Sequence, residues 1–374
     1  MLRNYMGIIN LEESEKDIRS LTNFRPIGTV PVAGRFRVID FALSNLVNAG
    51  LRHVSVFCKK ETRSLTDHLG AGRPWDLDRK KQGLNILPPN MRGAQNGIIR
   101  GDLDMLAGIH DFIRRSHQTY VILSLGTSLY SVDFADVIKK HKESQADITV
   151  MYKQMQGAAE KDLSRFTLLE LDENKRVTDI EVKPYYPKTT TASMDVYVME
   201  RQLLLSIIDE CNARGDHDFI KDAISKKLSG LHCYGYEFSG YTDKIDSISS
   251  YYKNNMLFLN SDMRKEMFNK KNPVYTKTKD QSPTRYGGEA IVENSLISDG
   301  CVIEGTVINS VLSRGVKVAK GSVVKNSVIM QDSVIKDNVY LDSVVFDKEV
   351  TISEGRKLIG QSNFPLAIAK GSVI

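Results

Sequence analysis

The sequence of 374 residues lacks most features of secreted, metal-binding and membrane proteins. Its longest apolar runs, such as residues 120–125 and 203–208, are much shorter than the roughly 20 residues that cross a bilayer. No apolar signal segment opens the chain, so we expect a cytoplasmic protein that does not bind membranes. The four cysteines form no CxxC motif and no Cys/His cluster, which favours reduced, buried thiols over disulfides or zinc: Cys58, Cys211, Cys233 and Cys301.

The sequence also lacks a concentration of positive charge. The net charge is only +5 and is spread along the chain. Nucleic-acid binding needs a basic stripe with aromatic side chains in it, so the composition favours small anionic ligands over nucleic acid. A length of 374 residues predicts two or three domains, and the hydrophobic fraction of 41% is enough for packed cores.

Short apolar runs alternate with helical patterns in the first two thirds of the chain. This βαβ alternation predicts an α/β domain whose open sheet has helices on both faces. A different pattern predicts a hairpin at residues 163–184, turning at residues 172–174 and laid over the sheet. The predicted strands are residues 6–9, 53–57, 120–125 and 148–152, and the predicted helices are residues 40–49, 134–143 and 199–213.

The last third of the chain is repetitive. Residues 269–283 have no periodicity and predict a linker. After it, pairs of aliphatic residues recur every five or six positions, starting at 291, 296, 302, 307, 311, 323, 328, 334 and 344. Glycines lie between them where the chain must turn, notably Gly300, Gly305, Gly315 and Gly321. This period predicts a parallel β-helix with exposed end rungs that favour oligomers, whereas a β-sandwich needs longer alternating strands.

The whole chain resembles the bacterial glucose-1-phosphate adenylyltransferases, or ADP-glucose pyrophosphorylases. That resemblance implies a Rossmann-like nucleotidyltransferase domain with a mixed, mostly parallel sheet (residues 1–268), a linker (269–285) and a left-handed β-helix of hexapeptide repeats (286–374). It also implies a tetramer that makes ADP-glucose for glycogen. The matching segments are PVAGRFRVIDFALSNLVNAGLRHVSVF (31–57), SLTDHL (64–69), LPP (87–89), VKP (182–184), ASMDVYVM (192–199) and DFIKD (218–222).

The chain departs from this family where nucleotide phosphates bind. Catalytic members have the loop GGRGTRL, and the corresponding residues here are EESEKDI (12–18), with Ser14 and Asp17 at degenerate catalytic positions. Backbone N–H groups approach phosphate closely only where glycine allows it, and the loop has none. Negative charge that repels polyphosphate comes from Glu12, Glu13 and Glu15.

Two magnesium-binding aspartates of the family are also replaced. Thr127 and Ser249 stand at their positions, and Ile27 replaces a phosphate-contacting lysine. One charge pair about 4 Å apart is worth roughly 4 kcal/mol at an effective dielectric near 20, or about three powers of ten in rate. We therefore expect very weak or no catalysis by this chain alone. We also expect no cofactor in it, with Mg²⁺ bound by a catalytic partner.

Part of the sugar-phosphate site resembles that of the family. Lys183 matches a lysine that contacts glucose 1-phosphate, although a solvated lysine fits equally well. Ser193 matches a glucose-side contact, but Asp195 replaces a glycine of the same segment and a structural role is favoured. Asp102 and Asp104 suggest either a relocated metal site or, as we prefer, acidic residues at the start of a helix.

Two further features allow two interpretations each. Trp75 either packs in the core or stacks on a ligand, and we prefer the packing role. Arg35 and Arg37 either contact an anionic effector or flank the turn before a helix.

These departures favour a noncatalytic regulatory subunit, similar to the GlgD-type subunits that pair with a catalytic chain. Its expected partner is a catalytic ADP-glucose pyrophosphorylase subunit in a hetero-oligomer, with a homo-oligomer as the alternative when alone and a sugar phosphate as a candidate effector. The enzyme alternative is a weakly active nucleotidyltransferase that converts ATP and glucose 1-phosphate to ADP-glucose and pyrophosphate. An acyltransferase is disfavoured because the last histidine, His232, precedes every repeat. A stand-alone structural protein is a further alternative.

Overall fold

The computed structural model describes residues 4–11, 15–58, 62–88 and 99–374. Residue contacts divide the chain into two units, which are described separately below. Unit 1 comprises Met1–Glu12, Phe41–Thr62 and Leu69–Thr242, and unit 2 comprises Glu13–Asp40, Arg63–His68 and Asp243–Ile374. An N-terminal segment thus groups with the C-terminal part of the chain.

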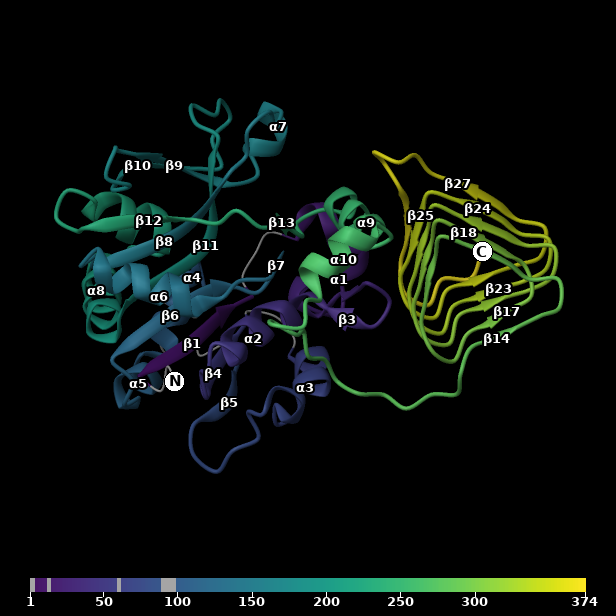
Figure 1. Ribbon diagram of the computed structural model, residues 1–374, viewed down its shortest axis with the longest axis horizontal. Coiled ribbons are helices and arrows are strands. Elements are labelled where there is room, and N and C mark those ends of the chain that lie inside the picture. Colours follow the sequence, from purple (N-terminus) through teal and green to yellow (C-terminus); the bar gives the residue numbers. More distant parts are fainter. Residues whose placement is uncertain (1–3, 12–14, 59–61, 89–98) are drawn as a thin grey trace. The chain divides into compact units, whose positions relative to one another are not determined.

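A nine-stranded mixed sheet forms the centre of unit 1 (Figure 1). Its main path is β10-β9-β11-β6-β1-β4-β5; off this path, β8 pairs with β11, and β12 pairs with β8. The strands are β1 (Tyr5–Asn10), β4 (His53–Phe57), β5 (Gly83–Leu87), β6 (Tyr120–Leu125), β8 (Ile148–Gln154), β9 (Thr167–Leu171), β10 (Val177–Val182), β11 (Thr191–Glu200) and β12 (Cys233–Glu237). All four predicted strands are confirmed, because continuous apolar runs suit strands covered on both faces.

Helices cover both faces of this sheet. On one face, Met6 and Ile8 of β1 share a buried core with α4 (Asp102–Gly108), α5 (His110–Arg115) and α8 (Arg201–Arg214). On the other, Gly7 faces α2 (Val38–Asn48): a Cβ at Gly7 would lie 2.7 Å from Leu46 Cδ1. The remaining helical segments of unit 1 are η3 (Arg73–Trp75), α6 (Phe134–Glu143), α7 (Glu160–Leu163) and a π-helix (Phe219–Ser225), and the short strand β7 is Ser128–Tyr130.

The three predicted helices are confirmed, although α2 begins two residues earlier than predicted and α8 begins two residues later. Met199 and Glu200 were assigned to the helix 199–213, but they belong to β11, and α8 begins at Arg201. Met199 pairs with Ile148 of β8 and with Val121 of β6. Apolar residues at a strand-to-helix junction fit both periodicities, so the pairing decided between them.

The predicted hairpin exists, but the expectation that it lies over the sheet was wrong. β9 and β10 pair antiparallel, and the Asp172 side chain closes their turn by accepting from the N–H groups of Asn174 and Arg176, both at 2.8 Å. Leu168 of β9 pairs with Ala192 of β11, so the hairpin extends the sheet at its edge. Extension gives the backbone of β9 a second hydrogen-bonding neighbour.

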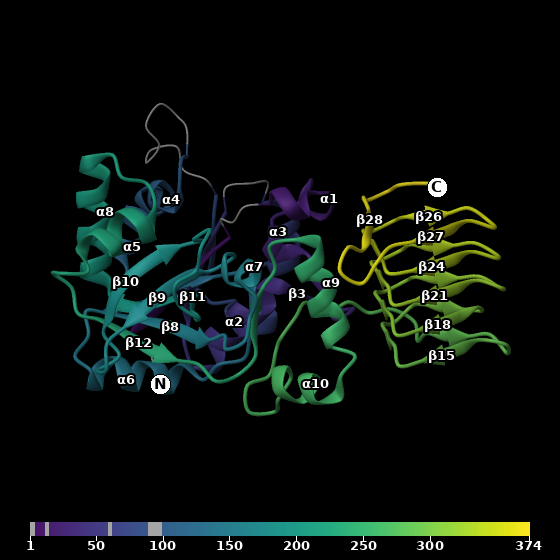
Figure 2. The ribbon, with the colours of Figure 1, turned by 90° about the horizontal axis from the view of Figure 1, so that it is seen from above.

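The repeats of unit 2 form a parallel β-helix of three five-stranded sheets (Figures 1 and 2). Each strand pairs with the strand three places later, as Val302 with Lys317 and Lys317 with Val334. This confirms the β-helix and excludes the β-sandwich. The strands are β14 (Arg285–Tyr286), β15 (Ile291–Glu293), β16 (Leu296–Ile297), β17 (Val302–Ile303), β18 (Thr306–Ile308), β19 (Val311–Leu312), β20 (Lys317–Val318), β21 (Val323–Lys325), β22 (Val328–Ile329), β23 (Val334–Ile335), β24 (Tyr340–Asp342), β25 (Val344–Phe346), β26 (Thr351–Ile352), β27 (Lys357–Ile359) and β28 (Leu366–Ile368).

One corner of the β-helix carries a ladder of amide side chains. Asn294, Asn309 and Asn326 have φ angles of 40°, 46° and 46°, a left-handed conformation that asparagine tolerates better than most residues. Asn294 Nδ2 donates to Asn309 Oδ1 at 2.8 Å, and Asn326 Nδ2 donates to Asp342 Oδ1 at 3.1 Å. The recurrent asparagines of the sequence therefore stabilise the turns and link successive rungs.

The N-terminal segment and α9 complete unit 2. Tyr251 Oη of α9 donates to Pro31 O and Tyr252 Oη to Asn326 O, both at 2.7 Å, so α9 holds the N-terminal segment on one side and the β-helix on the other. Irregular chain connects α10 to β14, and no helix in the described part of the chain is long and apolar enough to span a membrane. The elements are η1 (Lys16–Ile18), α1 (Arg19–Thr22), η2 (Ile27–Thr29), β2 (Pro31–Val32), β3 (Phe36–Arg37), α3 (Arg63–Leu69), β13 (Thr242–Lys244), α9 (Ile248–Leu257) and α10 (Ser261–Met267).

The close approach of successive rungs predicts that Gly305→Ala destabilises the β-helix. A Cβ at Gly305 would lie 2.4 Å from Ser322 O and 2.7 Å from Ala319 O, and backbone atoms cannot move aside as a side chain can. We expect a loss of about 1–3 kcal/mol in the free energy of unfolding, measured by urea denaturation. Gly288→Ala is the control, because no atom lies within 4 Å of its Cβ position. Equal stability of the two variants would contradict the prediction.

Candidate functional site

The carboxyl ends of β1 and β6 are where a sheet of this kind binds its ligands. β6 is followed by Gly126, whose N–H donates to Asn10 O at 2.8 Å, and a Cβ at Gly126 would lie 2.5 Å from Leu11 Cδ2. Thr127 comes next and is 0% exposed, and its Oγ1 has no hydrogen-bond partner among the described residues. A buried neutral hydroxyl supplies no anionic oxygen to a hard cation.

The described residues around this edge do not fit a magnesium ion. Within the part of the chain that the structure describes, no group of three or more His, Cys, Asp or Glu side chains is placed to hold a metal. Asp102 and Asp104, the candidates for a relocated site, are both engaged. Asp104 accepts from Arg100 Nε at 3.0 Å and Nη2 at 2.8 Å, and Asp102 Oδ1 accepts from the Phe219 N–H at 2.8 Å.

These two carboxyl groups have opposite pKa shifts. Burial raises the pKa of Asp102 to about 7, despite the hydrogen bond from Phe219, and the nearby Asp218 adds to the rise. Burial also acts to raise the pKa of Asp104, but the hydrogen bonds and charge of Arg100 outweigh it and hold that pKa below its usual value. The pair therefore anchors the start of α4 to its neighbours and offers no free anionic ligand.

The segment that resembles a sugar-phosphate site has an internal hydrogen-bond network. Ser193 is 2% exposed, and its Oγ accepts from the Asp195 N–H at 3.0 Å. Asp195 has a φ of 54°, so it keeps the left-handed backbone that suits the family's glycine while adding a carboxylate. Tyr197 Oη donates to Asp195 Oδ1 at 3.4 Å. The structural role of Ser193 is thus the one its contacts support.

The other sequence-predicted positions are dispersed. Lys183 is exposed after β10 with a φ of 49°, and its N–H donates to Phe166 O at 3.1 Å. Asp17 is exposed in η1, and Ser249 Oγ of α9 lies 3.5 Å from Asn363 O. Ser14, Glu12 and Glu13 lie outside the described residues. Trp75 is 1% exposed, as a packing anchor requires.

A second candidate site lies in unit 2, where four basic side chains gather. This cationic cluster consists of Arg25, Arg37, Arg314 and Lys348. The first three are 6%, 6% and 4% exposed. Arg25 forms an ion pair with Asp347, and its Nε donates to Leu21 O at 2.9 Å. Arg25 and Arg314 each act electrostatically on Arg37, and Arg25 and Arg37 each act on Lys348.

The cationic cluster has acidic neighbours but few ion pairs: Asp40 and Asp67 act electrostatically on Arg37, and Asp299 acts on Arg314. Arg37 Nη1 donates to neutral acceptors, Ser64 O at 2.9 Å and Ser64 Oγ at 3.1 Å. The described residues provide no ion pair for Arg37, Arg314 or Lys348, and Arg314 Nε is buried without a hydrogen-bond partner there. Buried charge without compensation is costly, so an anion that enters this cluster gains several charge-assisted contacts.

The pKa values of the cluster reflect the same excess of charge. Burial lowers the pKa of Lys348 to about 7, and the positive charges of Arg37 and Arg25 lower it further in the same direction. Burial likewise lowers the pKa of Arg37 to about 10, against the opposing effect of Asp40. A bound anion would favour the charged form of each group, so we expect binding to strengthen as Lys348 is protonated.

Sequence reasoning found only one member of this cluster. Arg37 was singled out as a candidate effector contact, together with Arg35, which is exposed and lies over the Phe36 ring. Arg25, Arg314 and Lys348 were missed. Arg25 pairs with a residue more than 300 positions away, and no local pattern in the sequence signals such a contact.

Comparisons with known proteins agree with the fold. Residues 16–261 match the family model of nucleotidyl transferases, and residues 279–363 match the GlmU-like C-terminal hexapeptide model. A glycogen biosynthesis protein GlgD from Bacillus subtilis (strain 168) is 35% identical over 303 residues, covering 80% of this chain and 77% of that protein. Two glucose-1-phosphate adenylyltransferases are also similar. That of Clostridium novyi (strain NT) is 32% identical and covers 76% of this chain and 74% of its own length. That of Thermomicrobium roseum (strain ATCC 27502 / DSM 5159 / P-2) is 35% identical, and the match covers 75% of this chain and 66% of that protein.

An α/β nucleotidyltransferase unit joined to a hexapeptide β-helix is thus the class of protein that the fold defines. The chain belongs to the glucose-1-phosphate adenylyltransferase family of nucleotidyl transferases, the family that also includes GlgD. The mixed sheet and the left-handed β-helix expected from the resemblance are confirmed. The boundaries at residues 268 and 285 stay a prediction.

The raised pKa of Asp102 predicts a pH-dependent loss of stability that Asp102→Asn removes. A carboxyl group whose pKa is about 7 when folded and near 4 when unfolded stabilises the fold below pH 4, and this stability is lost as the pH rises to 7. Thermal unfolding should show the variant to be more stable than the wild type at pH 8 and similar at pH 4. The control Asp104→Asn should be less stable than the wild type at pH 8, because Arg100 loses its charged partner.

The lowered pKa of Lys348 predicts that Lys348→Met stabilises unit 2 and weakens anion binding. The protonated lysine destabilises the fold fully below pH 7, and this cost disappears as the pH rises towards 10.5. The gain in Tm should therefore be larger at pH 6.5 than at pH 9.5, at about 2–4 °C for each kcal/mol relieved. Lys320→Met, at an exposed position of the same β-helix, is the control. If added sulfate stabilises Lys348→Met as much as it stabilises the wild type, the result would contradict the anion site.

Proposed function

We propose that this chain is a noncatalytic regulatory subunit that assembles with a catalytic glucose-1-phosphate adenylyltransferase and tunes ADP-glucose synthesis for glycogen. The observation that carries this proposal is the buried Thr127, which stands where the resemblance implies a magnesium-binding aspartate and whose hydroxyl has no hydrogen-bond partner among the described residues. The proposal leaves Mg²⁺ and catalysis to the partner, and it places both proteins in the cytoplasm.

The cationic cluster supports a regulatory role. Its buried charge fits an anionic effector such as a sugar phosphate, which would gain contacts with Arg37, Arg314 and Lys348. An effector changes an equilibrium between two states only through a difference in its affinity for them. We propose that the occupied cluster favours the state of the hetero-oligomer in which the catalytic subunit is active.

The ends of the β-helix support assembly. Apolar side chains are exposed on its first rung, where Ile291 is 50% and Tyr286 is 53% exposed, and near its last rung, where Phe364 is 80% exposed. Among the described residues, no further named strand pairs with the backbone edges of the end rungs, although Thr351 of β26 forms an isolated bridge with Val373. Such edges commonly associate with another chain. We propose that they contribute to the contacts of a hetero-oligomer, with a heterotetramer as the expected form.

The test is to purify this chain, the catalytic glucose-1-phosphate adenylyltransferase of the same organism, and the two proteins after co-expression. We expect no Mg²⁺-dependent pyrophosphate release by this chain alone. The co-expressed proteins should form one larger species by light scattering, with a turnover or substrate affinity that differs from that of the catalytic subunit alone. Turnover by the isolated chain at the rate of its partner would instead establish the nucleotidyltransferase alternative.

Arg37→Gln separates regulation from assembly in the same experiment. The variant should still assemble, because the ends of the β-helix are unchanged, and it should lose the response of the complex to anionic effectors. Arg35→Gln, an exposed neighbour outside the cationic cluster, is the matched control. Absence of any change in mass and activity on mixing would eliminate the regulatory proposal.

A further inference from the structure

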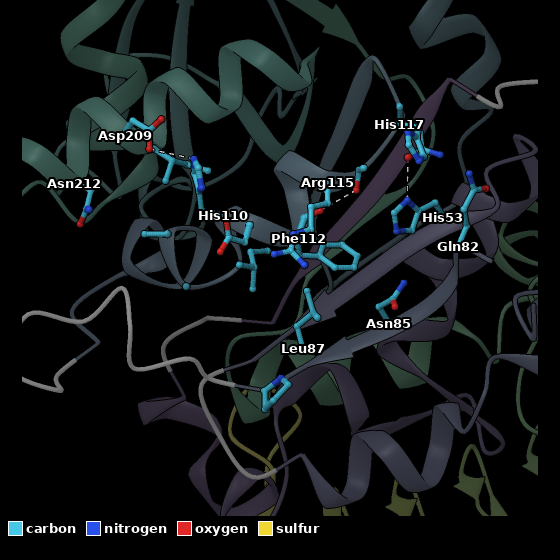
Figure 3. Close-up of a pocket in the computed structure, with 18 of the residues that line it drawn as sticks. His53, Gln82, Asn85, Leu87, His110, Phe112, Arg115, His117, Asp209 and Asn212 are labelled. Atoms are coloured by element: carbon cyan, nitrogen blue, oxygen red, sulfur yellow. Dashed lines mark hydrogen bonds and ion pairs between the residues drawn. The ribbon is translucent and has the colours of Figure 1, made fainter. Parts of the chain in front are cut away.

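A groove in unit 1 lies on the face of the sheet that carries α5 and α8 (Figure 3). It follows β5, the edge strand of the main path, from Lys81 and Gln82 before the strand to Leu87 and Pro88 at its end. Its volume is about 1240 Å³. Small-molecule pockets typically measure about 300–1,000 Å³, so the groove has room for an extended ligand.

The charges that line the groove balance. Lys81 and Arg115 provide two positive groups, and Asp111 and Asp209 provide two negative groups. Asp209 Oδ1 lies 3.1 Å from His110 Nε2. Burial lowers the pKa of His53, which keeps this imidazole neutral at physiological pH. The groove thus differs from the cationic cluster of unit 2, and its lining gives no general attraction to anions.

Side chains that both donate and accept hydrogen bonds lie along the groove. Four amide side chains line it: Gln82, Asn85, Gln118 and Asn212. An amide donates through its nitrogen and accepts through its oxygen, which matches adjacent hydroxyl groups that also do both. Gln118 Oε1 accepts from His53 Nδ1 at 3.0 Å, which directs the other ring nitrogen away from Gln118.

Apolar side chains occupy the middle of the groove. Figure 3 shows Phe112 and Leu87 there, with His53 and His117 towards one end and Asp209 and Asn212 towards the other. The Phe112 ring makes an edge contact with the His53 ring at a centroid distance of 5.3 Å, which fixes its orientation. A ring between hydrogen-bonding groups suits a ligand with apolar faces and polar edges.

We propose that this groove binds a carbohydrate chain, with Phe112 and Leu87 against the faces of the sugar rings and the amide and charged side chains on their hydroxyl groups. The lining is uncharged overall, rich in paired donors and acceptors, and longer than a single sugar requires. The choice of an α-glucan as the chain rests on the proposed function in glycogen synthesis. Binding would hold the regulatory subunit beside the polymer whose precursor its partner makes.

Calorimetric titration of the full chain with maltoheptaose tests this assignment. We expect a Kd of about 1 mM or below for maltoheptaose, and much weaker binding of glucose, which fills only part of the groove. Arg115→Ala and Asn212→Ala should each weaken maltoheptaose binding at least about fivefold. Both side chains are exposed, so the variants should keep the wild-type Tm. Two variants are used so that the test remains valid if one of them misfolds.

The control is Arg214→Ala, an exposed arginine of α8 that pairs with Glu210 and does not line the groove. It should bind maltoheptaose like the wild type. Inorganic phosphate tests whether the groove binds anions instead. It is titrated into Arg37→Gln so that the cationic cluster does not contribute. No maltoheptaose binding, binding that neither groove variant weakens, or phosphate binding that Arg115→Ala removes would overturn the proposal. A failure here with normal activation of the catalytic partner would leave the regulatory function intact.

Discussion

The buried ion pair between Arg25 and Asp347 is the constraint on which the organisation of unit 2 depends. Arg25 belongs to the segment that in catalytic relatives leads away from the nucleotide loop, and Asp347 belongs to the β-helix. Removing either partner would leave an uncompensated buried charge, at a cost of about 3–5 kcal/mol. The pair therefore holds the N-terminal segment against the β-helix. Hydrogen bonds of Tyr251 and Asn255 of α9 to Pro31 and Ala33 hold the same segment.

Charged side chains are distributed unevenly between the carboxyl end of β6 and the cationic cluster of unit 2. The carboxyl end of β6 carries a buried threonine where the resemblance implies an acid, while Asp102 and Asp104 serve the packing of α4. In unit 2, three arginines and Lys348 remain close together with one carboxylate in direct contact. Keeping such a cluster is costly to the fold, and the anionic effector that we propose would offset the cost.

Local patterns in the sequence predicted most of the fold. The strands at residues 53–57 and 120–125 and the helix at 134–143 were predicted with the bounds that the structure has, because their apolar spacing fits only one period. The hairpin was predicted as an element but misplaced, since strand pairing joins residues distant in sequence. Of the cationic cluster, only Arg37 was predicted, because its neighbours come from three separate parts of the chain.

The sequence by itself determined the α/β unit and the β-helix, and from the resemblance it predicted the loss of acidic and glycine residues at the phosphate and metal positions. These properties depend on residue type and on spacing between near neighbours. Only the tertiary structure decided that Thr127 is buried and that the groove along β5 has balanced charges. It also decided the ion pairs of Arg100 with Asp104 and of Arg25 with Asp347. Burial and electrostatic pairing depend on which distant segments fold together, and no local pattern contains that information.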